Sequence, residues 1–566
     1  MCGIAGILGS YKKEQLHTML NTIIHRGPDA TDTYFDNQIA LGHNRLSIID
    51  LSPAANQPFI SNDGRFILVF NGEIYNYLEL KTLLKEAYNF KTDSDSEVLL
   101  AAYTVWGKDC LEKLKGMFAF AVWDVHTKTL FVARDRFGVK PFYYHQSSST
   151  FYFASEIKAL FAAGIAKNYH EKVWANYFIH GSYGDINETF WNEIYQLPAG
   201  HYLLKSDQKI SIKKWYFFEN RVENYLHNDL SSQEAMDRYS ILLRESINLR
   251  FRSDVPIGFN VSGGLDSSTL LAYVNQQENS SNIQAYTFYT GDERYDELPW
   301  VQQMLSITDN PLKEVLFSAE EVKYYHEKIS YHQDEPYGGI PTLAYTKIFE
   351  QARKDGFVVL LDGQGMDEQW AGYDYYIKKS ESLIQGVSKS PFKKNTLSQD
   401  FLDLSKKPTY PELFDDEILN LQYRDLFHTK IPRALRFNDR VSMAFSTELR
   451  EPFLDHDLVE FAFSLPQDYK ISKGVQKYLL RKIVSKLLPA KITYAPKRPI
   501  QTPQREWIGN ELKSEIDNGI ERIYSSKYTH WFDLDQVQSE WKKYLEGDND
   551  SSFHIWQWYN FSQLID

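Results

Sequence analysis

Cysteine is scarce in this chain of 566 residues, which contains only Cys2 and Cys110. Two cysteines give no disulfide framework, and this composition is typical of a reducing compartment, so we expect a cytoplasmic location. No apolar run approaches the roughly 18 residues of a membrane span. The N-terminus also lacks the basic segment and the long apolar segment of a signal peptide. The sequence therefore predicts no membrane partner.

Positively charged residues are also in the minority. The chain has 62 Lys and Arg residues and 75 Asp and Glu residues, which gives a net charge of -13. Such a balance argues against a nucleic-acid partner, which requires a basic face. It does not exclude a nucleotide bound by local backbone N–H groups. The length predicts two to four domains. It leaves the oligomeric state open, with a homodimer as one option.

The order of apolar runs divides the chain into two parts. Residues 1 to about 205 alternate short apolar runs with turn signals and helical patterns, which predicts antiparallel sheets with flanking helices. A polar stretch at 218–234 marks the expected boundary between a domain at 1–217 and one at 235–566. In the second part, the buried runs 255–261 and 357–361 each end in a Gly-bearing loop. This pattern predicts a parallel α/β sheet with ligands at the strand C-termini, and helical patterns dominate from about residue 400.

Cys2 becomes the N-terminal residue when Met1 is removed. A terminal cysteine carries its own base, because its α-amino group has a pKa near ~8 and can take the thiol proton. A small residue beside Met1 is the simpler explanation when Cys2 is considered alone.

Several polar clusters in the first part supply what an attack on the amide of glutamine requires: a nucleophile, donors for an oxyanion, a cation and an anion. Arg45 ends an expected strand, Asn71 and Gly72 form an expected turn followed by Glu73, and Asp95 lies at an expected helix N-terminus. Each also has an ordinary explanation, as a structural arginine, a hairpin turn or a helix cap.

Taken together, these motifs resemble the class II, N-terminal-nucleophile glutamine amidotransferase domain. The resemblance continues through 134–141 and 155–160. It implies that Cys2 is the nucleophile, that Asn71 and Gly72 form the oxyanion hole, and that Arg45 binds the glutamine carboxylate. It implies that Asp95 binds the ammonium group and that Glu73 lies in the same pocket.

A second motif, Ser262-Gly263-Gly264-Leu265-Asp266-Ser267-Ser268, follows Val261 and precedes a helical pattern. Strand, Gly-rich turn and helix can bind phosphate through backbone N–H groups. The loop is not a Walker A loop, because it lacks Gly-Lys-Ser/Thr. Serines and one aspartate suit a pyrophosphate group with Mg²⁺. A Gly-Gly turn before a helix is weak evidence by itself.

The full run resembles the PP-loop of ATP pyrophosphatases, which cleave ATP between the α- and β-phosphates. The resemblance implies an ATP site that includes Val261–Ser268, Asp362, Gly363 and Arg481, with Asp266 and Asp367 as Mg²⁺ ligands. Lys477 and Arg481 would share one face of a helix. Lys477 would neutralise charge on the phosphates, although an ordinary solvated basic face would show the same spacing.

A glutaminase followed by a PP-loop domain resembles the glutamine-hydrolysing asparagine synthetase family from end to end. The segments 439–444 and 448–455 add to this match. The family's reaction makes ammonia at one site, adenylates a carboxylate at the other, and displaces AMP with the ammonia. Because ammonia would be lost in open water, we expect a sheltered path between the sites.

Two departures concern the acceptor pocket, where we place Gln364, Gly338 and Gly339. The best-known asparagine synthetases have Glu where this chain has Gln364, and an amide cannot act as a general base. The segment 334–345 contains no arginine, although aspartate needs a cation for its α-carboxylate. With the two glycines making room, these departures suggest a larger acceptor. Aspartate is the default acceptor, because cations can come from elsewhere, and a sugar uronate is the alternative.

Four other classes are weaker. Phosphoribosyl and fructose-6-phosphate amidotransferases lack the PP-loop. A β-lactam-forming synthetase has typically lost the terminal nucleophile. A binding or storage protein would not need Cys2, the 262–268 loop and Asp367 together.

Overall fold

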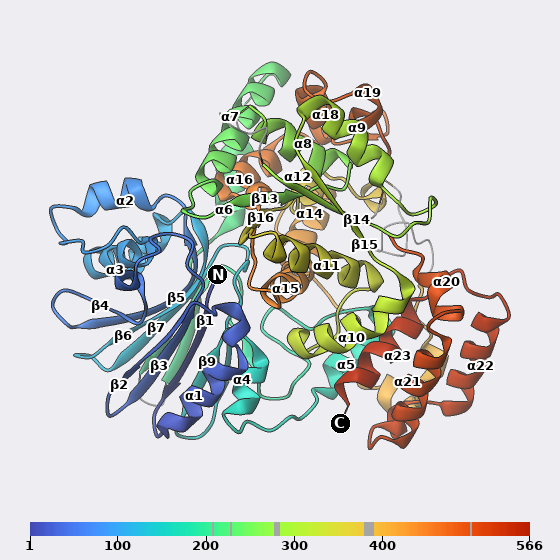
Figure 1. Cartoon of the computed structure of the whole chain (residues 1–566), viewed down its shortest axis with the longest axis horizontal. Coiled ribbons are helices and arrows are strands. Elements are labelled where there is room, and N and C mark those ends of the chain that lie inside the picture. Colours follow the sequence, from blue (N-terminus) through green and yellow to red (C-terminus); the bar gives the residue numbers. More distant parts are fainter. Residues whose placement is uncertain (207–208, 227–228, 277–282, 378–389, 499–500, 566) are drawn as a thin grey trace.

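The computed structural model describes residues 1–566 except 207–208, 227–228, 277–282, 378–389, 499–500 and 566. Two stacked antiparallel sheets form its N-terminal part, and a parallel sheet with surrounding helices forms the rest (Figure 1). This architecture is the one predicted from the sequence. None of the helices in the described ranges is long and apolar enough to cross a bilayer.

The first sheet has the strand order β10-β8-β9-β1-β3-β2, and the second has the order β12-β11-β7-β6-β5-β4. The first sheet consists of β1 (Gly3–Leu8), β2 (Ala30–Phe35), β3 (Ile39–Arg45), β8 (Tyr143–Gln146), β9 (Phe151–Ala154) and β10 (Tyr195–Gln196). The second consists of β4 (Phe59–Ile60), β5 (Phe66–Ile74), β6 (Gly116–Asp124), β7 (Thr129–Arg134), β11 (His201–Ser206) and β12 (Lys209–Lys214). The helices of this part are α1 (Lys13–Thr22), α2 (Tyr77–Leu84), α3 (Asp95–Trp106), α4 (Ile157–Ala162), α5 (Glu171–His180) and α6 (Phe218–Leu226).

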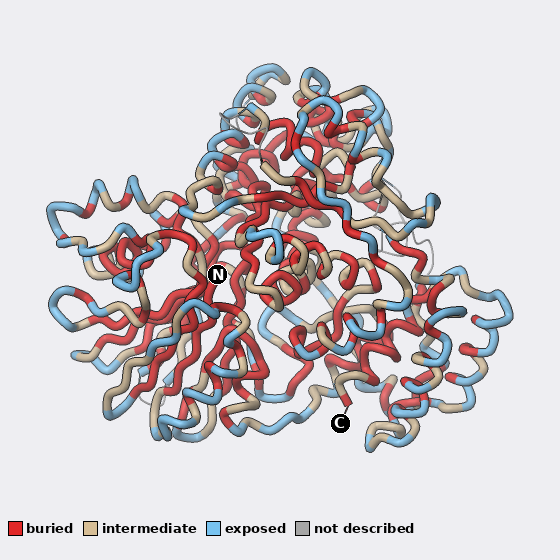
Figure 2. Tube along the Cα trace, viewed as in Figure 1, coloured by how far each residue is buried: buried red, intermediate tan, exposed pale blue. Residues whose placement is uncertain are grey.

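Strand β5 shows why these sheets stack. Alternate side chains of a strand point to opposite faces. Ile67 and Val69 join the core between the two sheets, while Leu68 and Phe70 join a second core shared with α2 and α3. Both faces of the strand are therefore buried. Figure 2 shows buried residues along much of the two antiparallel sheets.

The third sheet is parallel throughout, with the order β15-β14-β13-β16-β17. It consists of β13 (Ile257–Asn260), β14 (Ala285–Tyr289), β15 (Leu312–Leu316), β16 (Val359–Leu361) and β17 (Glu448–Arg450), and a separate hairpin pairs β18 (Ile471–Ser472) with β19 (Val475–Gln476). The preceding and intervening helices are α7 (Ser232–Arg250), α8 (Leu265–Val274), α9 (Leu298–Thr308), α10 (Ala319–Gln333), α11 (Ile340–Lys354) and α12 (Met366–Gln369).

Helices dominate the C-terminal part, as expected. They are α13 (Gln399–Leu402), α14 (Glu417–Phe427), α15 (Lys430–Met443), α16 (His456–Ser464), α17 (Gln467–Lys470), α18 (Tyr478–Val484), α19 (Ala490–Thr493), α20 (Gln504–Gly509), α21 (Lys513–Ser525), α22 (Leu534–Leu545) and α23 (Phe553–Leu564). Strand β17 comes from this part of the chain and completes the parallel sheet. The polar stretch at the expected boundary begins with helix α6.

Candidate active sites

The N-terminal site is a pocket of about 330 Å³ at the start of β1. Five residues predicted from the sequence line it, namely Cys2, Arg45, Gly72, Glu73 and Asp95. The sixth, Asn71, contacts Cys2 directly, because its Oδ1 accepts a 3.0 Å hydrogen bond from the Cys2 backbone nitrogen. The fold thus gathers all six residues from four separate segments of the chain.

The Cys2 nitrogen is the atom that becomes the α-amine when Met1 is removed. While Met1 is present, it is buried in this pocket, and its ammonium nitrogen lies 3.2 Å from Oε2 of Glu448. Burial raises the pKa of the Cys2 thiol above its ordinary value, more than the nearby N-terminal charge lowers it. Removal of Met1 would place a basic amine next to this protonated thiol.

Asn71 and Gly72 lie inside strand β5 rather than in a turn, so that expectation was wrong. The Asn71 side chain still has a donor to offer, because its Nδ2 is buried and has no hydrogen-bond partner among the described residues. Gly72 has a φ of +155°, and a Cβ there would lie 2.1 Å from the carbonyl oxygen of Met117. The close approach of β6 therefore requires glycine at this position.

Arg45 and Asp95 are both buried in the pocket wall. The Arg45 guanidinium donates to the carbonyl oxygen of Ser52 at 2.7 Å and to Oδ1 of Asn56 at 2.8 Å, which fixes its position. Asp95 accepts the Ile74 N–H at 2.8 Å, and burial raises its pKa to about 6. A fixed cation and a fixed carboxyl group in one pocket can bind the two charged groups of an α-amino acid.

Glu73 adds a further carboxyl group to this pocket. Its Oε2 lies 3.6 Å from Nη2 of Arg450, which belongs to strand β17 of the parallel sheet. Burial, together with Glu448 and Asp95, raises the pKa of Glu73 well above its ordinary value. A residue of the second half of the chain therefore contacts a residue that lines the N-terminal pocket.

The second site is a pocket of about 500 Å³ at the carboxyl edge of the parallel sheet. Its lining includes residues from the ends of β13, β14 and β16, as expected for ligands of a parallel sheet. The predicted residues in this wall are Val261, Ser262, Ser267 and Asp362, and residues Tyr295, Asp296 and Glu297 lie beside them. Tyr345, Asn260 and Gln501 also line it, and the sequence patterns did not single them out.

The loop from β13 to α8 has the predicted strand, Gly-rich turn and helix geometry. The Ser262 N–H donates to Oγ of Ser267 at 3.1 Å, which closes the turn. Gly263 has a φ of +67°, and a Cβ there would lie 2.7 Å from the Trp300 side chain. The hydroxyl of Ser268 is buried without a partner. Backbone N–H groups at the start of α8 are available to bind an anion.

Two carboxylates and two lysines meet beside this loop. Nζ of Lys477 lies 2.5 Å from Oδ1 of Asp266 and 2.6 Å from Oδ1 of Asp367. Lys497 pairs with Asp367, and its Nζ lies 3.7 Å from Asp266. Burial raises the pKa of Asp367, but the ammonium groups of Lys477 and Lys497 lower it by a larger amount. The pKa of Asp367 therefore lies below its ordinary value. Lys497 was not predicted, and its only sequence signal is a Pro-Lys-Arg segment without a motif.

Asp266 and Asp367 fit a hard divalent cation, because carboxylate oxygens are the ligands that Mg²⁺ prefers. The lysines provide the positive charge that the paired carboxylates require in this structure. The same lysines are placed where phosphate oxygens bound to such a cation would lie close to them.

Lys477 and Arg481 do not share a helical face as predicted. Lys477 precedes α18 as its N-cap residue with a φ of +54°. The Arg481 guanidinium donates to the carbonyl oxygens of Gln476, at 2.8 Å, and Thr493, at 2.5 Å. Its described contacts therefore tie down the segments around Lys477 and Lys497.

The predicted acceptor residues lie in two places, Gln364 next to Asp362 and the two glycines just before α11. The Gln364 side chain hydrogen-bonds the carboxyl group of Asp362, and its backbone N–H donates to Glu451. A Cβ on Gly339 would lie 2.1 Å from Oε1 of Gln504, and one on Gly338 would lie 3.4 Å from the Phe437 ring. The room next to these glycines is thus used by side chains of this chain.

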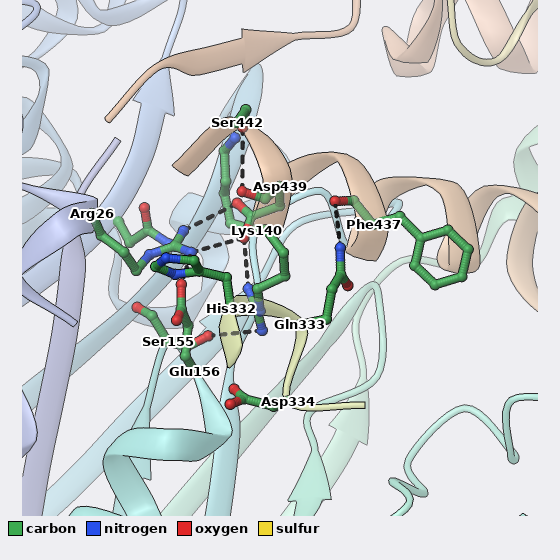
Figure 3. A network of polar contacts seen from close by, with 12 residues as sticks. Arg26, Lys140, Ser155, Glu156, His332, Gln333, Asp334, Phe437, Asp439 and Ser442 are labelled. Atoms are coloured by element: carbon green, nitrogen blue, oxygen red, sulfur yellow. Dashed lines mark hydrogen bonds and ion pairs between the residues drawn. The ribbon is translucent and has the colours of Figure 1, made fainter. Parts of the chain in front are cut away.

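A buried ionic network joins the two halves of the molecule (Figure 3). Arg26 lies between Glu156 and Asp439, with Nη1 2.7 Å from Glu156 Oε1 and 2.9 Å from Asp439 Oδ2. Lys158 extends the network to Asp334, whose Oδ2 lies 3.1 Å from its Nζ. Arg26, Glu156 and Lys158 belong to the N-terminal part, whereas Asp334 and Asp439 follow or lie in helices of the second part. The two sites are therefore held in one fixed relation.

Comparison with known families agrees with this division. The family model described as a glutamine amidotransferase domain matches residues 1–216, and the one described as asparagine synthase matches residues 238–566. Among solved structures, glutamine phosphoribosylpyrophosphate amidotransferase from Bacillus subtilis covers 46% of this chain and 60% of its own, at 19% identity and a TM-score of 0.30.

Curated relatives extend over both halves. Asparagine synthetase [glutamine-hydrolyzing] 1 of Bacillus subtilis is 28% identical over 98% of this chain and 95% of its own. A putative asparagine synthetase [glutamine-hydrolyzing] of Methanocaldococcus jannaschii is 35% identical over 70% of this chain and 82% of its own. A protein named amidase chry2 of Gibberella zeae is 25% identical over 91% of both chains. The chain is therefore an enzyme of the glutamine-hydrolysing asparagine synthetase family.

Proposed function

We propose that this enzyme transfers the amide nitrogen of glutamine to the side-chain carboxylate of L-aspartate, with ATP cleaved to AMP and pyrophosphate. The observation that supports this most is the presence of two complete sites in one chain. One has a cysteine that becomes N-terminal when Met1 is removed, within a charged pocket. The other has two carboxylates and two lysines beside a phosphate-binding loop.

In the glutaminase half, the thiolate of Cys2 attacks the amide carbon of glutamine, with its own α-amine as the base. The oxyanion that forms would accept hydrogen bonds from Asn71 Nδ2, which lacks any other partner, and from the Gly72 N–H. Ammonia leaves as the C–N bond breaks, and water then hydrolyses the thioester. Arg45 would bind the carboxylate of glutamine, and Asp95 would bind its ammonium group.

In the synthetase half, an oxygen of the acceptor carboxylate attacks the α-phosphorus of ATP, and pyrophosphate leaves. Asp266 and Asp367 would hold Mg²⁺, which shields the phosphate charge when it is bound. Lys477 and Lys497 would turn from these carboxylates to the phosphate oxygens, where they stabilise the charge that develops on pyrophosphate. The loop of residues 262–268 would bind the same phosphates through its backbone.

Aspartate is supported as the acceptor by what surrounds the predicted pocket. The space at Gly339 contains Gln504, so it does not call for a larger acceptor. The segment 334–345 contains no arginine, but Arg436 of α15 contacts it. Nη1 of Arg436 lies 2.6 Å from Oε2 of Glu335, and Nη2 donates to the carbonyl oxygen of Pro336. Its Nε is buried, has no hydrogen-bond partner in the described part of the chain, and could bind a carboxylate.

The test measures AMP and pyrophosphate release from ATP and glutamine, with L-aspartate or UDP-glucuronate as acceptor. We expect release with aspartate and formation of asparagine. The Asp266→Asn and Asp367→Asn variants should lose this release and keep glutamine hydrolysis. Release with UDP-glucuronate alone would contradict the aspartate assignment. Wild-type release from both Asn variants would contradict the assignment of the ATP site.

A further inference from the structure

Amide formation releases a proton that some group must accept. When ammonia attacks an acyl-adenylate, the carbonyl carbon gains a C–N bond, the C–O bond to AMP breaks, and the nitrogen loses one proton. Gln364 cannot take this proton, since an amide is not a base at neutral pH. A carboxyl group from a neighbouring strand lies next to it.

That group is Glu451, which the register of the parallel sheet brings beside Asp362. Strands β16 and β17 pair with Leu361 opposite Arg450, so Asp362 and Glu451 are the first residues beyond the two strand ends. The Asp362 N–H donates to the carbonyl oxygen of Arg450 at 3.0 Å, which keeps the strands together at this point. The backbone N–H of Gln364 then donates to the Glu451 carboxyl group.

Both carboxyl groups are buried and retain an unused acceptor atom. Glu451 is 4% exposed and Asp362 is 8% exposed. Oε2 of Glu451 and Oδ2 of Asp362 have no hydrogen-bond partner among the described residues. A buried polar atom without a partner is costly, so a native protein retains one where a ligand or a reaction uses it. Asp362 lines the ATP pocket, which places this pair at its wall.

Three charged residues from different parts of the chain affect the ionisation of Glu451. Asp362 opposes its ionisation, while Lys140 of the N-terminal part and Arg250 of α7 favour it. The effects of burial and of the Asp362 charge are larger than those of the two cations, so the pKa of Glu451 lies well above its ordinary value. A carboxylate in this setting is a stronger base than one in water.

Strand β17 also connects the two active sites over a short distance. At its start, Glu448 contacts the chain's ammonium terminus in the glutaminase pocket, at 3.2 Å. Just past its end, Glu451 lies beside Asp362, which lines the ATP pocket. A strand rises about 3.3 Å per residue, so roughly 10 Å of chain separates these two Cα atoms. Ammonia that passes along β17 would reach the synthetase site at Glu451.

We propose that Glu451 is the proton acceptor for the amide-forming step. Its carboxylate takes the proton that the attacking nitrogen loses as the C–O bond to AMP breaks, and it thereby supplies the carboxylate that Gln364 lacks. This inference rests on the proposed function and adds a residue to its second half.

The test compares Glu451→Gln, which keeps the shape of the side chain, with Glu451→Asp. Adenylation is followed as aspartate-dependent exchange of labelled pyrophosphate into ATP, without ammonia or glutamine. Amide formation is followed with ammonium chloride as the nitrogen source. We expect Glu451→Gln to retain exchange and the KM for aspartate within about twofold, while kcat for asparagine falls roughly 10²-fold or more. Glu451→Asp should recover part of that loss.

Glu460→Gln is the matched control, because Glu460 is also buried but contacts the Tyr216 hydroxyl, away from the pocket. It should leave both activities unchanged. Wild-type asparagine formation by Glu451→Gln would overturn the inference. So would loss of exchange together with a raised KM for aspartate, which would mean that Glu451 binds the acceptor. A wild-type enzyme without aspartate-dependent exchange would instead contradict the proposed function.

Discussion

Nζ of Lys477 lies 2.6 Å from Oδ1 of Asp367, and a glycine makes this contact possible. A Cβ on Gly372 would lie 2.1 Å from Oδ1 of Asp367 and 2.4 Å from Cε of Lys477. The ion pair therefore depends on the absence of a side chain at residue 372. It keeps a buried carboxylate ionised and correctly placed before any cation or nucleotide binds.

Lys497 should matter nearly as much as Lys477. We expect Lys497→Ala to lower the rate of pyrophosphate release by roughly 10²-fold, because one of two cations that stabilise the departing phosphate is lost. Glutamine hydrolysis should be unaffected. The measurement is steady-state pyrophosphate release with saturating aspartate, and the control is Lys491→Ala, at an exposed lysine nearby. Equal rates for Lys497→Ala and wild type would remove Lys497 from the site.

Cys2→Ala should abolish glutamine hydrolysis and leave synthesis from added ammonium intact, because the thiol belongs to one pocket and ATP to the other. A chain that retains Met1 should behave similarly, since Met1 occupies the glutaminase pocket and blocks the α-amine. Mass spectrometry paired with a glutaminase assay checks both points. Fully active protein with Met1 still attached would show that the α-amine is not the base.

Asp95 should set an acidic limit on glutamine use. Its pKa is raised to about 6, so its carboxylate is converted to the neutral acid as the pH falls through that value. Only the carboxylate attracts the ammonium group of glutamine. We therefore expect kcat/KM for glutamine to fall about tenfold per pH unit below pH ~6. Synthesis from ammonium should lack this limb, and Asp95→Asn should be weak in glutamine use at every pH. A flat glutamine profile from pH 5 to 8 would exclude Asp95 from binding.

The pair of Arg26 and Asp439 should contribute strongly to stability. Both are buried, and removing one partner leaves an unpaired charge inside the protein. We expect Asp439→Ala to lower the free energy of unfolding by about 3–5 kcal/mol. Thermal and urea unfolding measure it. Lys513→Ala, which breaks an exposed pair with Asp517, should change it by less than about 1 kcal/mol. Similar losses for the two variants would show that the buried network has no special role.

The pH dependence of that network has a defined sign. Asp439 and Glu156 both have lowered pKa values in the folded protein, against the effect of burial, because arginine and lysine side chains surround them. Their contribution to stability is therefore complete above the pKa of the unfolded chain and is lost as the pH falls.

Local motifs were sufficient to predict the architecture and to single out six residues that the fold brings together at Cys2. The serine and glycine run at 262–268 likewise predicted its strand, turn and helix. These features depend on segments of a few residues. Asn71 and Gly72 show the limit of such patterns, because the same dipeptide suits a hairpin turn and a strand whose neighbour approaches closely.

Contacts between distant segments could not be predicted. Lys497 reaches Asp367, Arg26 reaches Asp439, and Glu451 reaches Asp362 only through tertiary packing. Lys477 likewise follows the short hairpin of β18 and β19 and has a left-handed conformation. It therefore precedes helix α18 and does not lie inside the predicted helix. Sequence spacing carries no signal for such arrangements.

The most direct test of the account follows the nitrogen. Wild-type enzyme is given ATP, L-aspartate and glutamine labelled with ¹⁵N in the side-chain amide, in the presence of an excess of unlabelled ammonium at a pH where free ammonia is scarce. The account predicts asparagine whose amide nitrogen is mostly ¹⁵N, with one AMP and one pyrophosphate formed per asparagine. Asparagine that carries the solution's unlabelled nitrogen, or no asparagine at all, would contradict it.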